Sequence, residues 1–155
     1  MAPKTRPVGI YAPFPAHDVV AIMRALKYTV GEPEFRSGFN SPVYCDSHKA
    51  PLCLTGFGHR KPGLALKMRG VRIAGINWEP VHYNPRRAVR QGWAKKVEEW
   101  HEHVYTDDFG AKTVKAITIP TENTDSLLTF CLRRWNIEAR GPLAGQLPGD
   151  LFPRT

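Results

Sequence analysis

Four cysteine and histidine side chains lie close together near the middle of the chain. They follow the pattern C-x2-H-x4-C-x5-H and are Cys45, His48, Cys53 and His59. Thiolate and imidazole groups at short spacing are typical ligands of tetrahedral zinc, although structural zinc sites usually join a C-x2-C pair to a second pair. Cys45 and Cys53 also lie in apolar runs, where a free cysteine packs as a small hydrophobic side chain. We therefore favour a packing role, keep zinc as the alternative, and expect no other cofactor.

A second polar cluster, WHEHVYTDD, occupies residues 100–108. We expect it to end a helix. Side chains two residues apart on a helix point in nearly opposite directions, so His101 and His103 would not share a metal there. Glu98 and His101 would share a face, as in the E-x-x-H motif of carboxylate-bridged metal proteins, but those sites need a second copy, which this sequence lacks. A solvated helix end is the preferred interpretation.

Positive charge is concentrated in residues 49–96. This segment holds eleven of the 22 Lys and Arg residues and one acid, Glu79, which gives it a charge of +10. The other 107 residues contain 11 bases and 13 acids and therefore carry −2. Such a concentration favours a polyanionic partner, either RNA, DNA or an acidic protein surface, because summed charge governs association rather than fold.

The strongest candidates for contact with such a partner come from a predicted hairpin at 64–76 and from the start of a helix that opens at Asn84-Pro85. That helix is expected to carry arginines in its first turns and glutamates in its last, against the helix dipole, which points to an external partner for the arginines. A solvated basic surface, or one neutralised by the acidic stretch 98–108, is the alternative. The candidate binding residues are Lys67, Arg69, Arg72, Tyr83, Arg86, Arg87 and Arg90.

These residues predict a non-enzymatic basic binding or structural subunit of a larger assembly, such as a nucleoprotein particle or a virion. Tyr83 is the candidate for stacking on bases. The sequence has no signature of a known nucleic-acid-binding module, so contact with the nucleic acid backbone is favoured over sequence reading. The alternative is a small enzyme acting on an anionic, nucleotide-like substrate in a cleft with His82, His101 or Asp107, with a metal as an option.

Length and composition indicate one domain over residues 1–155, with hydrophobic content of 42%. The Pro- and Gly-rich segments 1–8 and 141–155 are expected to be extended arms that lie on neighbouring subunits or fray. Three cysteines, without a signal-peptide pattern, predict reduced thiols and an intracellular location. No apolar run is long enough to cross a membrane.

The residue pattern predicts an α+β fold, a mixed or antiparallel sheet packed with about three helices, with a ferredoxin-like arrangement with additions as one option. The most regular apolar stripe runs at helical spacing from Val89 through Trp93, Val97 and Trp100 to Val104, and predicts the second helix. The other predicted elements are strands at 8–12, 42–46, 51–57, 111–119 and 137–140, a hairpin at 64–76 turning at Gly70, and helices at 15–28 and 124–135.

Residues 25–49 resemble the opening of orotate phosphoribosyltransferases. The similarity rests on Phe35, the Ser37-Gly38 pair, the Ser41-Pro42 pair, Tyr44 and Asp46. The resemblance implies binding of phosphoribosyl pyrophosphate by a strand that ends in two acids and by a Gly/Thr-rich loop after it. The nearest segment, VYTDDFGAKT at 104–113, lacks both the apolar strand and that loop, so no catalytic residue is assigned from the resemblance.

Overall fold

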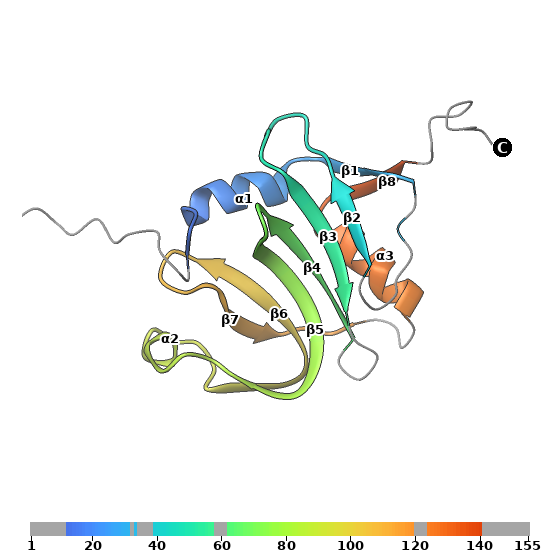
Figure 1. The fold of residues 1–155 in the computed structure, drawn as a ribbon. Helices are drawn as coiled ribbons and strands as arrows, with labels where there is room; N and C mark the ends of the chain where they lie inside the picture. The colour runs from blue at the N-terminus through green and yellow to red at the C-terminus, as the bar shows by residue number, and fades with distance from the viewer. Residues whose placement is uncertain (1–11, 32, 34–38, 58–61, 120–123, 141–155) are drawn as a thin grey trace, which may run out of the picture.

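A strongly curved antiparallel sheet dominates the protein, as the computed structural model of the chain shows (Figure 1). The structure describes residues 12–31, 33, 39–57, 62–119 and 124–140. Six strands pair in the order β2-β3-β4-β5-β6-β7, each antiparallel to its neighbour, and two further strands, β1 and β8, pair in parallel. The strands are β1 (Lys27–Val30), β2 (Asn40–Val43), β3 (Leu52–Phe57), β4 (Gly63–Met68), β5 (Val71–Tyr83), β6 (Lys96–Thr106), β7 (Gly110–Ala116) and β8 (Ile137–Arg140). The helices are α1 (Ala16–Arg24), α2 (Arg86–Arg90) and α3 (Thr124–Arg134).

This architecture overturns the prediction of an α+β fold with helices packed on a sheet. The molecule is mostly β, with 50% strand and 20% helix. Its six-stranded sheet consists of strands that follow one another in the chain, so the split connections of a ferredoxin-like fold do not occur in it. The expectation of an antiparallel sheet with about three helices holds only in that coarse sense, because the helices are short and α2 has five residues.

The largest error concerns the predicted second helix. After α2 the chain turns at Gly92, whose φ of 107° is a left-handed value suited to glycine, and continues as strand β6. Val97, Trp100 and Val104 therefore belong to a strand, where β-branched and aromatic residues are favoured. The glutamates at 98, 99 and 102 lie in or beside that strand, so the argument from a helix charged against its dipole no longer applies.

Other elements lie where the local pattern placed them. The hairpin turns at Arg69 and Gly70, between β4 and β5, and α3 and β8 match the last predicted helix and strand. The first helix ends at Arg24 rather than 28, because Lys27 begins β1. The predicted strand at 8–12 falls almost wholly outside the described residues, and so do both arms, 1–8 and 141–155.

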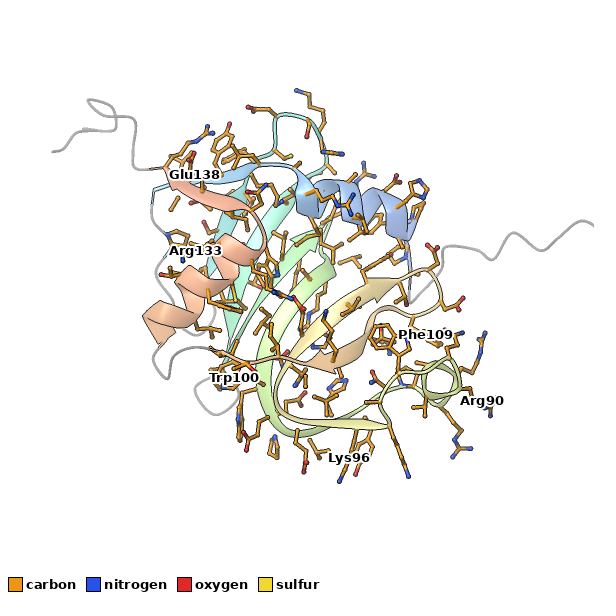
Figure 2. All side chains as sticks on the ribbon, turned by 180° about the vertical axis from the view of Figure 1, so that it is seen from behind. Arg90, Lys96, Trp100, Phe109, Arg133 and Glu138 are labelled. Carbon is orange, nitrogen blue, oxygen red and sulfur yellow. The ribbon has the colours of Figure 1, made fainter. Side chains whose placement is uncertain are left out.

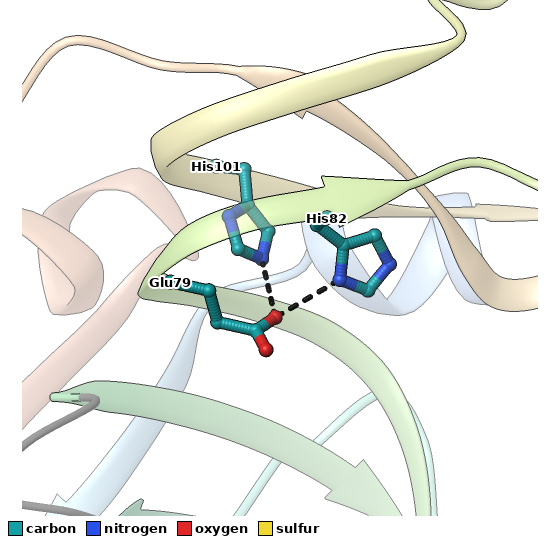
Figure 3. A group of neighbouring side chains, drawn as sticks. All are labelled: Glu79, His82 and His101. Atoms are coloured by element: carbon teal, nitrogen blue, oxygen red, sulfur yellow. Dashed lines mark hydrogen bonds and ion pairs between the residues drawn. The ribbon is translucent and has the colours of Figure 1, made fainter.

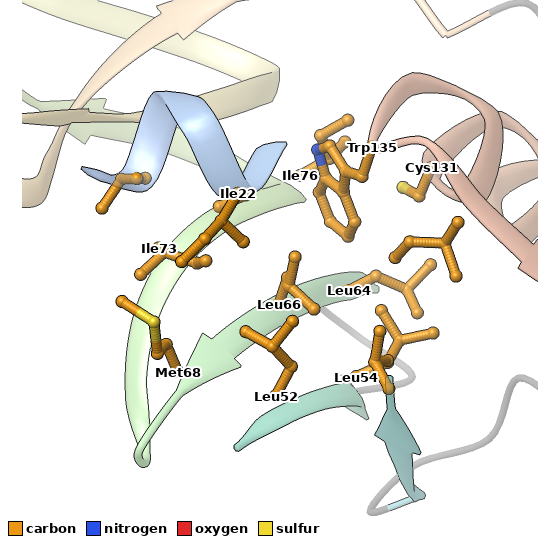
Figure 4. Close-up of a cluster of buried hydrophobic side chains, with 14 of the residues drawn as sticks. Ile22, Leu52, Leu54, Leu64, Leu66, Met68, Ile73, Ile76, Cys131 and Trp135 are labelled. Carbon is orange, nitrogen blue, oxygen red and sulfur yellow. The ribbon is translucent and has the colours of Figure 1, made fainter. Parts of the chain in front are cut away.

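The main hydrophobic core lies between one face of strands β3 to β5 and the helices α1 and α3 (Figure 4). Side chains alternate along a strand, so Leu64 and Leu66 of β4 point to this face while Ala65 and Lys67 point to the other. Trp135 closes the core after α3 and is 2% exposed. This packing fixes the face of the sheet that the core uses and leaves the opposite face for polar groups.

The opposite face is enclosed where the long strands β5 and β6 curl over toward β7 (Figure 1). The curl is held by Asn84, which follows β5 and lies against the backbone of β7. Its side-chain amide donates to the Val114 carbonyl at 2.9 Å and accepts from the Val114 N–H at 2.7 Å. We call β5, α2 and β6 together the curled arm. Hydrophobic residues buried outside the main core are Ala65, Ala88, Val97, Phe109 and Val114.

Candidate functional site

The predicted binding residues do not form one continuous patch. Arg69 lies in the β4–β5 turn, whereas Arg86, Arg87 and Arg90 lie on α2, at the other end of the 13-residue strand β5 (Figure 1). Lys67 is opposite Arg72 across the β4–β5 pair. The hairpin and α2 are therefore separate surfaces, in contrast to the single surface that the sequence suggested.

Arg72 differs from the other candidates because it is turned toward the interior. Its Nη1 lies 3.2 Å from His103 Nε2. Burial lowers the pKa of Arg72, and the nearby carboxylate of Glu79 opposes that shift. Arg72 thus belongs to an interior polar network rather than to an exposed contact surface.

The remaining arginines gather on α2, where all three side chains are exposed. Lys96 is paired across the strands with Tyr83, which is 61% exposed. Figure 2 places Arg90 and Lys96 at the same end of the molecule, far from Arg133 and Glu138. We define the arm-tip surface as Tyr83, Arg86, Arg87, Arg90, Lys95 and Lys96, all of them exposed.

Acidic neighbours do not neutralise this surface through ion pairs. Within the described part of the chain, no acidic side chain pairs with Arg86, Arg87 or Arg90. Asp108 accepts instead from Gln91 Nε2 at 3.0 Å, and the guanidinium of Arg87 lies 5.8 Å from the centre of the Phe109 ring. The arm-tip surface therefore keeps its full positive charge.

A shallow hollow adjoins the arm-tip surface. It has a volume of about 700 Å³, and its lining includes Trp93, Lys96 and Lys115. Glu98 also lines this hollow, and Lys115 pairs with Glu102 at 3.7 Å, so its charge is mixed.

The four predicted zinc ligands are not assembled into one site among the described residues. Cys45 Sγ lies 3.7 Å from His48 Nδ1 and 3.4 Å from Ser47 Oγ. Cys53, on β3, donates to the side chain of Asn40 instead. The described residues contain no metal-competent group around these cysteines. His59 lies outside the described residues.

The curled arm builds a different cluster, rich in histidine. Gly75 pairs with His103 and Asn77 pairs with His101 across β5 and β6. Because residues two apart in a strand point to the same face, His101 and His103 lie side by side, with ring centroids 5.4 Å apart. The expectation that these two histidines point in opposite directions was wrong, because it assumed a helix.

A β-bulge brings two more side chains to this face. Glu79 pairs with Glu99, yet the next pair joins His82 to Val97, so β5 has one extra residue at this point. In a regular strand, residues three apart point to opposite faces; the extra residue removes that difference. Glu79 and His82 consequently both point toward His101 (Figure 3).

The contacts within this cluster centre on one carboxylate oxygen. Oε2 of Glu79 accepts a hydrogen bond from His82 Nδ1 at 2.9 Å and lies 3.5 Å from His101 Nε2 (Figure 3). Glu79 and His82 are each about a quarter exposed, at 24% and 25%, and the side chain of His101 is fully buried. The cluster therefore has one side open to solvent. We call Glu79, His82 and His101 the His/Glu triad.

Behind the triad, His103 is held neutral. Burial and the charge of Arg72 lower its pKa to about 3. Its Nδ1–H donates to the Ala111 carbonyl at 2.7 Å, and its Nε2 accepts from Arg72 Nη1 at 3.2 Å. His103 thus packs against the rings of His82 and His101 as an uncharged side chain.

Part of this cluster was visible in the sequence. The sequence predicts His82 and His101 as residues of a catalytic cleft, whereas Asp107 lies outside the cluster and accepts from the backbone N–H of Ala16 at 2.7 Å. Glu79 was noted only as the single acid of the basic segment. That isolation was the available signal, because a lone carboxylate among many bases needs a partner when it is half-buried.

Comparison of the chain with protein-family models, curated proteins and solved structures found no significant match. The resemblance to orotate phosphoribosyltransferases thus gains no support from a family model. None of the helices in the described ranges has the length and apolar character needed to cross a bilayer.

Proposed function

We propose that the chain is a non-enzymatic binding subunit that contacts the phosphate backbone of a nucleic acid through the arm-tip surface. The observation that carries this proposal is the group of three exposed arginines on α2 that have no ion-pair partner in the described residues. Positive side chains without acidic partners at one end of a molecule attract polyanions and raise their local concentration.

The chemistry of the surface suits phosphate. An arginine can hold a phosphate through two parallel hydrogen bonds, and the adjacent lysines add compact point charges. Tyr83 is 61% exposed and lies opposite Lys96, so a base could stack on its ring while a phosphate meets the ammonium group. Contact of this kind follows the backbone and is largely independent of sequence.

A role within a larger assembly, either a nucleoprotein particle or a virion, fits a small chain whose cationic residues are exposed on a protruding arm. An acidic protein surface would use the same charges. The two partners differ in how binding depends on salt and on aromatic stacking, and the experiment separates them.

Binding to single-stranded RNA and to duplex DNA of random sequence should be measured across a salt series. The logarithm of the affinity should fall with the logarithm of salt concentration by about 0.7 per phosphate contact for single strands and about 0.9 for duplex. A variant carrying Arg86→Gln, Arg87→Gln and Arg90→Gln should lose about two to three units of that slope.

The matched control is a variant with Arg24→Gln, Lys49→Gln and Arg133→Gln, which removes equal charge from exposed positions away from α2. It should keep most of the slope. Equal loss in both variants would show that net charge alone causes binding, and a lack of binding at low salt would eliminate the nucleic acid and leave the acidic protein.

A small enzyme acting on an anionic, nucleotide-like substrate is the second candidate, and the His82–Glu79 hydrogen bond favours it. A carboxylate that holds Nδ1–H leaves Nε2 of the same ring available as a general base. Hydrolysis of nucleotides and phosphodiesters that disappears in His82→Gln but persists in His48→Gln would support the enzyme. Equal activity in both variants would remove it.

A further inference from the structure

We infer that the His/Glu triad is a binding site for a divalent transition-metal ion of the zinc type. The ligand atoms of Glu79, His82 and His101 all lie within 4.8 Å of one another. Zinc bonds to nitrogen and oxygen are about 2.0–2.2 Å long, so ligand atoms of a tetrahedral site are about 3.4 Å apart. The observed separations from Glu79 Oε2, 2.9 Å and 3.5 Å, are close to that value.

The buried Nε2 of His101 is the strongest argument for a cation. Its Nδ1–H donates to the Glu99 carbonyl at 2.9 Å, so the neutral ring presents an unprotonated Nε2. This nitrogen is buried and has no hydrogen-bond partner among the described residues. It faces Glu79 Oε2 at 3.5 Å, so that two groups with lone pairs face each other. A metal ion held by Glu79 Oε2 would give His101 Nε2 the partner that it lacks.

The surroundings of His101 oppose a proton in place of the metal. Burial lowers the pKa of His101, and the charge of Arg72 and the neighbouring His82 act in the same direction. The Glu79 carboxylate and the Glu99 carbonyl raise the pKa but do not outweigh burial. Burial thus favours the uncharged form of His101, which is the form that binds metals.

The surroundings also have the features of a metal site. The carbonyl of Glu99 accepts from His101 Nδ1 and so fixes the orientation and tautomer of the ring, as hydrogen-bond partners do for many metal-ligating histidines. Glu79 and His82 are partly exposed, which gives an ion a path of entry and leaves a coordination position for water. Two imidazoles with one carboxylate suit Zn²⁺, Co²⁺, Ni²⁺ or Fe²⁺ rather than Mg²⁺ or Ca²⁺.

Arg72 is the feature that acts against the ion, and it limits the expected affinity. Its guanidinium lies 3.2 Å from His103 Nε2, and its positive charge also acts on Glu79 of the triad. Binding of the metal also requires the proton on His82 Nδ1 to leave that nitrogen.

The test uses untagged protein freed of metal with a chelator. Titration with Zn²⁺ by calorimetry should give one ion per chain, and titration with Co²⁺ should give the visible absorption of a four- or five-coordinate ion. Glu79→Gln and His82→Gln keep the size of the side chains and should each weaken binding at least 10-fold. Both positions are partly exposed, so these variants avoid the risk that a change at buried His101 unfolds the protein.

The matched controls are His17→Gln, at an exposed histidine, and His48→Gln, beside Cys45. Both should bind Zn²⁺ as the unchanged chain does. Lack of saturable binding, equal binding by the triad variants, or equally tight binding of Mg²⁺ would each overturn the inference. Loss of metal in Glu79→Gln with an unchanged salt slope for RNA would separate this site from the arm-tip surface.

Discussion

The ammonium group of Lys27 donates a hydrogen bond of 2.6 Å to the carbonyl oxygen of Ile22, in the last turn of α1. The same nitrogen reaches the carbonyls of Met23 at 3.1 Å and Ala25 at 2.7 Å. Carbonyls at a helix C-terminus lack partners within the helix and attract positive charge. Lys27 is fully buried, and burial lowers its pKa to about 8. A buried lysine therefore completes the end of this helix.

Replacement of Lys27 by methionine should destabilise the protein by about 2–4 kcal/mol, because three carbonyls lose their donor. The measurement is urea unfolding at pH 7. Lys49→Met, at an exposed position, is the control and should change the free energy of unfolding by less than about 0.5 kcal/mol. If Lys27→Met is as stable as the unchanged chain, the cost of burying the ammonium group offsets its hydrogen bonds.

The protein should lose stability in acid. The pKa of His103 in the fold is about 3, below its ordinary value of 6.5, so between these values the unfolded chain takes up a proton that the folded chain does not. The free energy of unfolding should therefore fall as pH falls below 6.5, by up to about 1.4 kcal/mol per pH unit for this group. The pKa of His101 is lowered too and acts in the same direction.

Urea unfolding at pH 7, 6 and 5 measures this slope. His103→Gln removes the titrating group, keeps a side chain of similar length and should flatten the slope, although the variant starts from lower stability. His17→Gln, at an exposed position, should leave the slope unchanged. An identical slope in His103→Gln and the unchanged chain would mean that other groups cause the acid sensitivity.

The ion pair between Arg134 of α3 and Glu102 of β6 should contribute to stability. Its two hydrogen bonds are 2.5 Å and 2.8 Å long, and the Glu102 side chain is 11% exposed. Glu102→Gln leaves the partly buried guanidinium of Arg134 without its charged partner. This change should therefore cost about 1–3 kcal/mol. Glu138→Gln breaks the exposed pair with Arg140 and should cost much less, because solvent screens that pair. Equal costs in urea unfolding would contradict the role assigned to burial.

The local residue pattern was sufficient to predict an element where it fits only one periodicity, either that of a helix or that of a strand. Gly70 marks the β4–β5 hairpin, and the segment at 124–134 has helical spacing with basic residues in its last turn. Residues 89–104 fit two periods, since Val97, Trp100 and Val104 suit a helical stripe while His101, His103 and Tyr105 alternate inward as in a strand. Pairing with β5 decides between them, and a single sequence does not contain that long-range contact.

The candidate site was harder to predict for the same reason. Side chains of histidines two residues apart lie together only if the segment is extended. Because the segment was predicted as a helix, His101 and His103 were predicted to point apart. The approach of Glu79 and His82 depends on one extra residue in β5, which shifts the register without altering the residue pattern. Predicting the exposed arginines of α2 required only two signals. The concentration of basic residues marks the surface, and Asn84-Pro85 marks the start of a helix.

The contact of Asn84 with Val114 also concerns the behaviour of many copies of this chain in solution. β7 is the last strand of the six-stranded sheet, and the outer edge of such a strand can add a strand from another molecule and start polymer growth. The Asn84 amide already occupies the outward N–H and C=O of Val114, near the middle of that edge. The Asn84 side chain thus blocks the pairing of a foreign strand at Val114, one position of this edge.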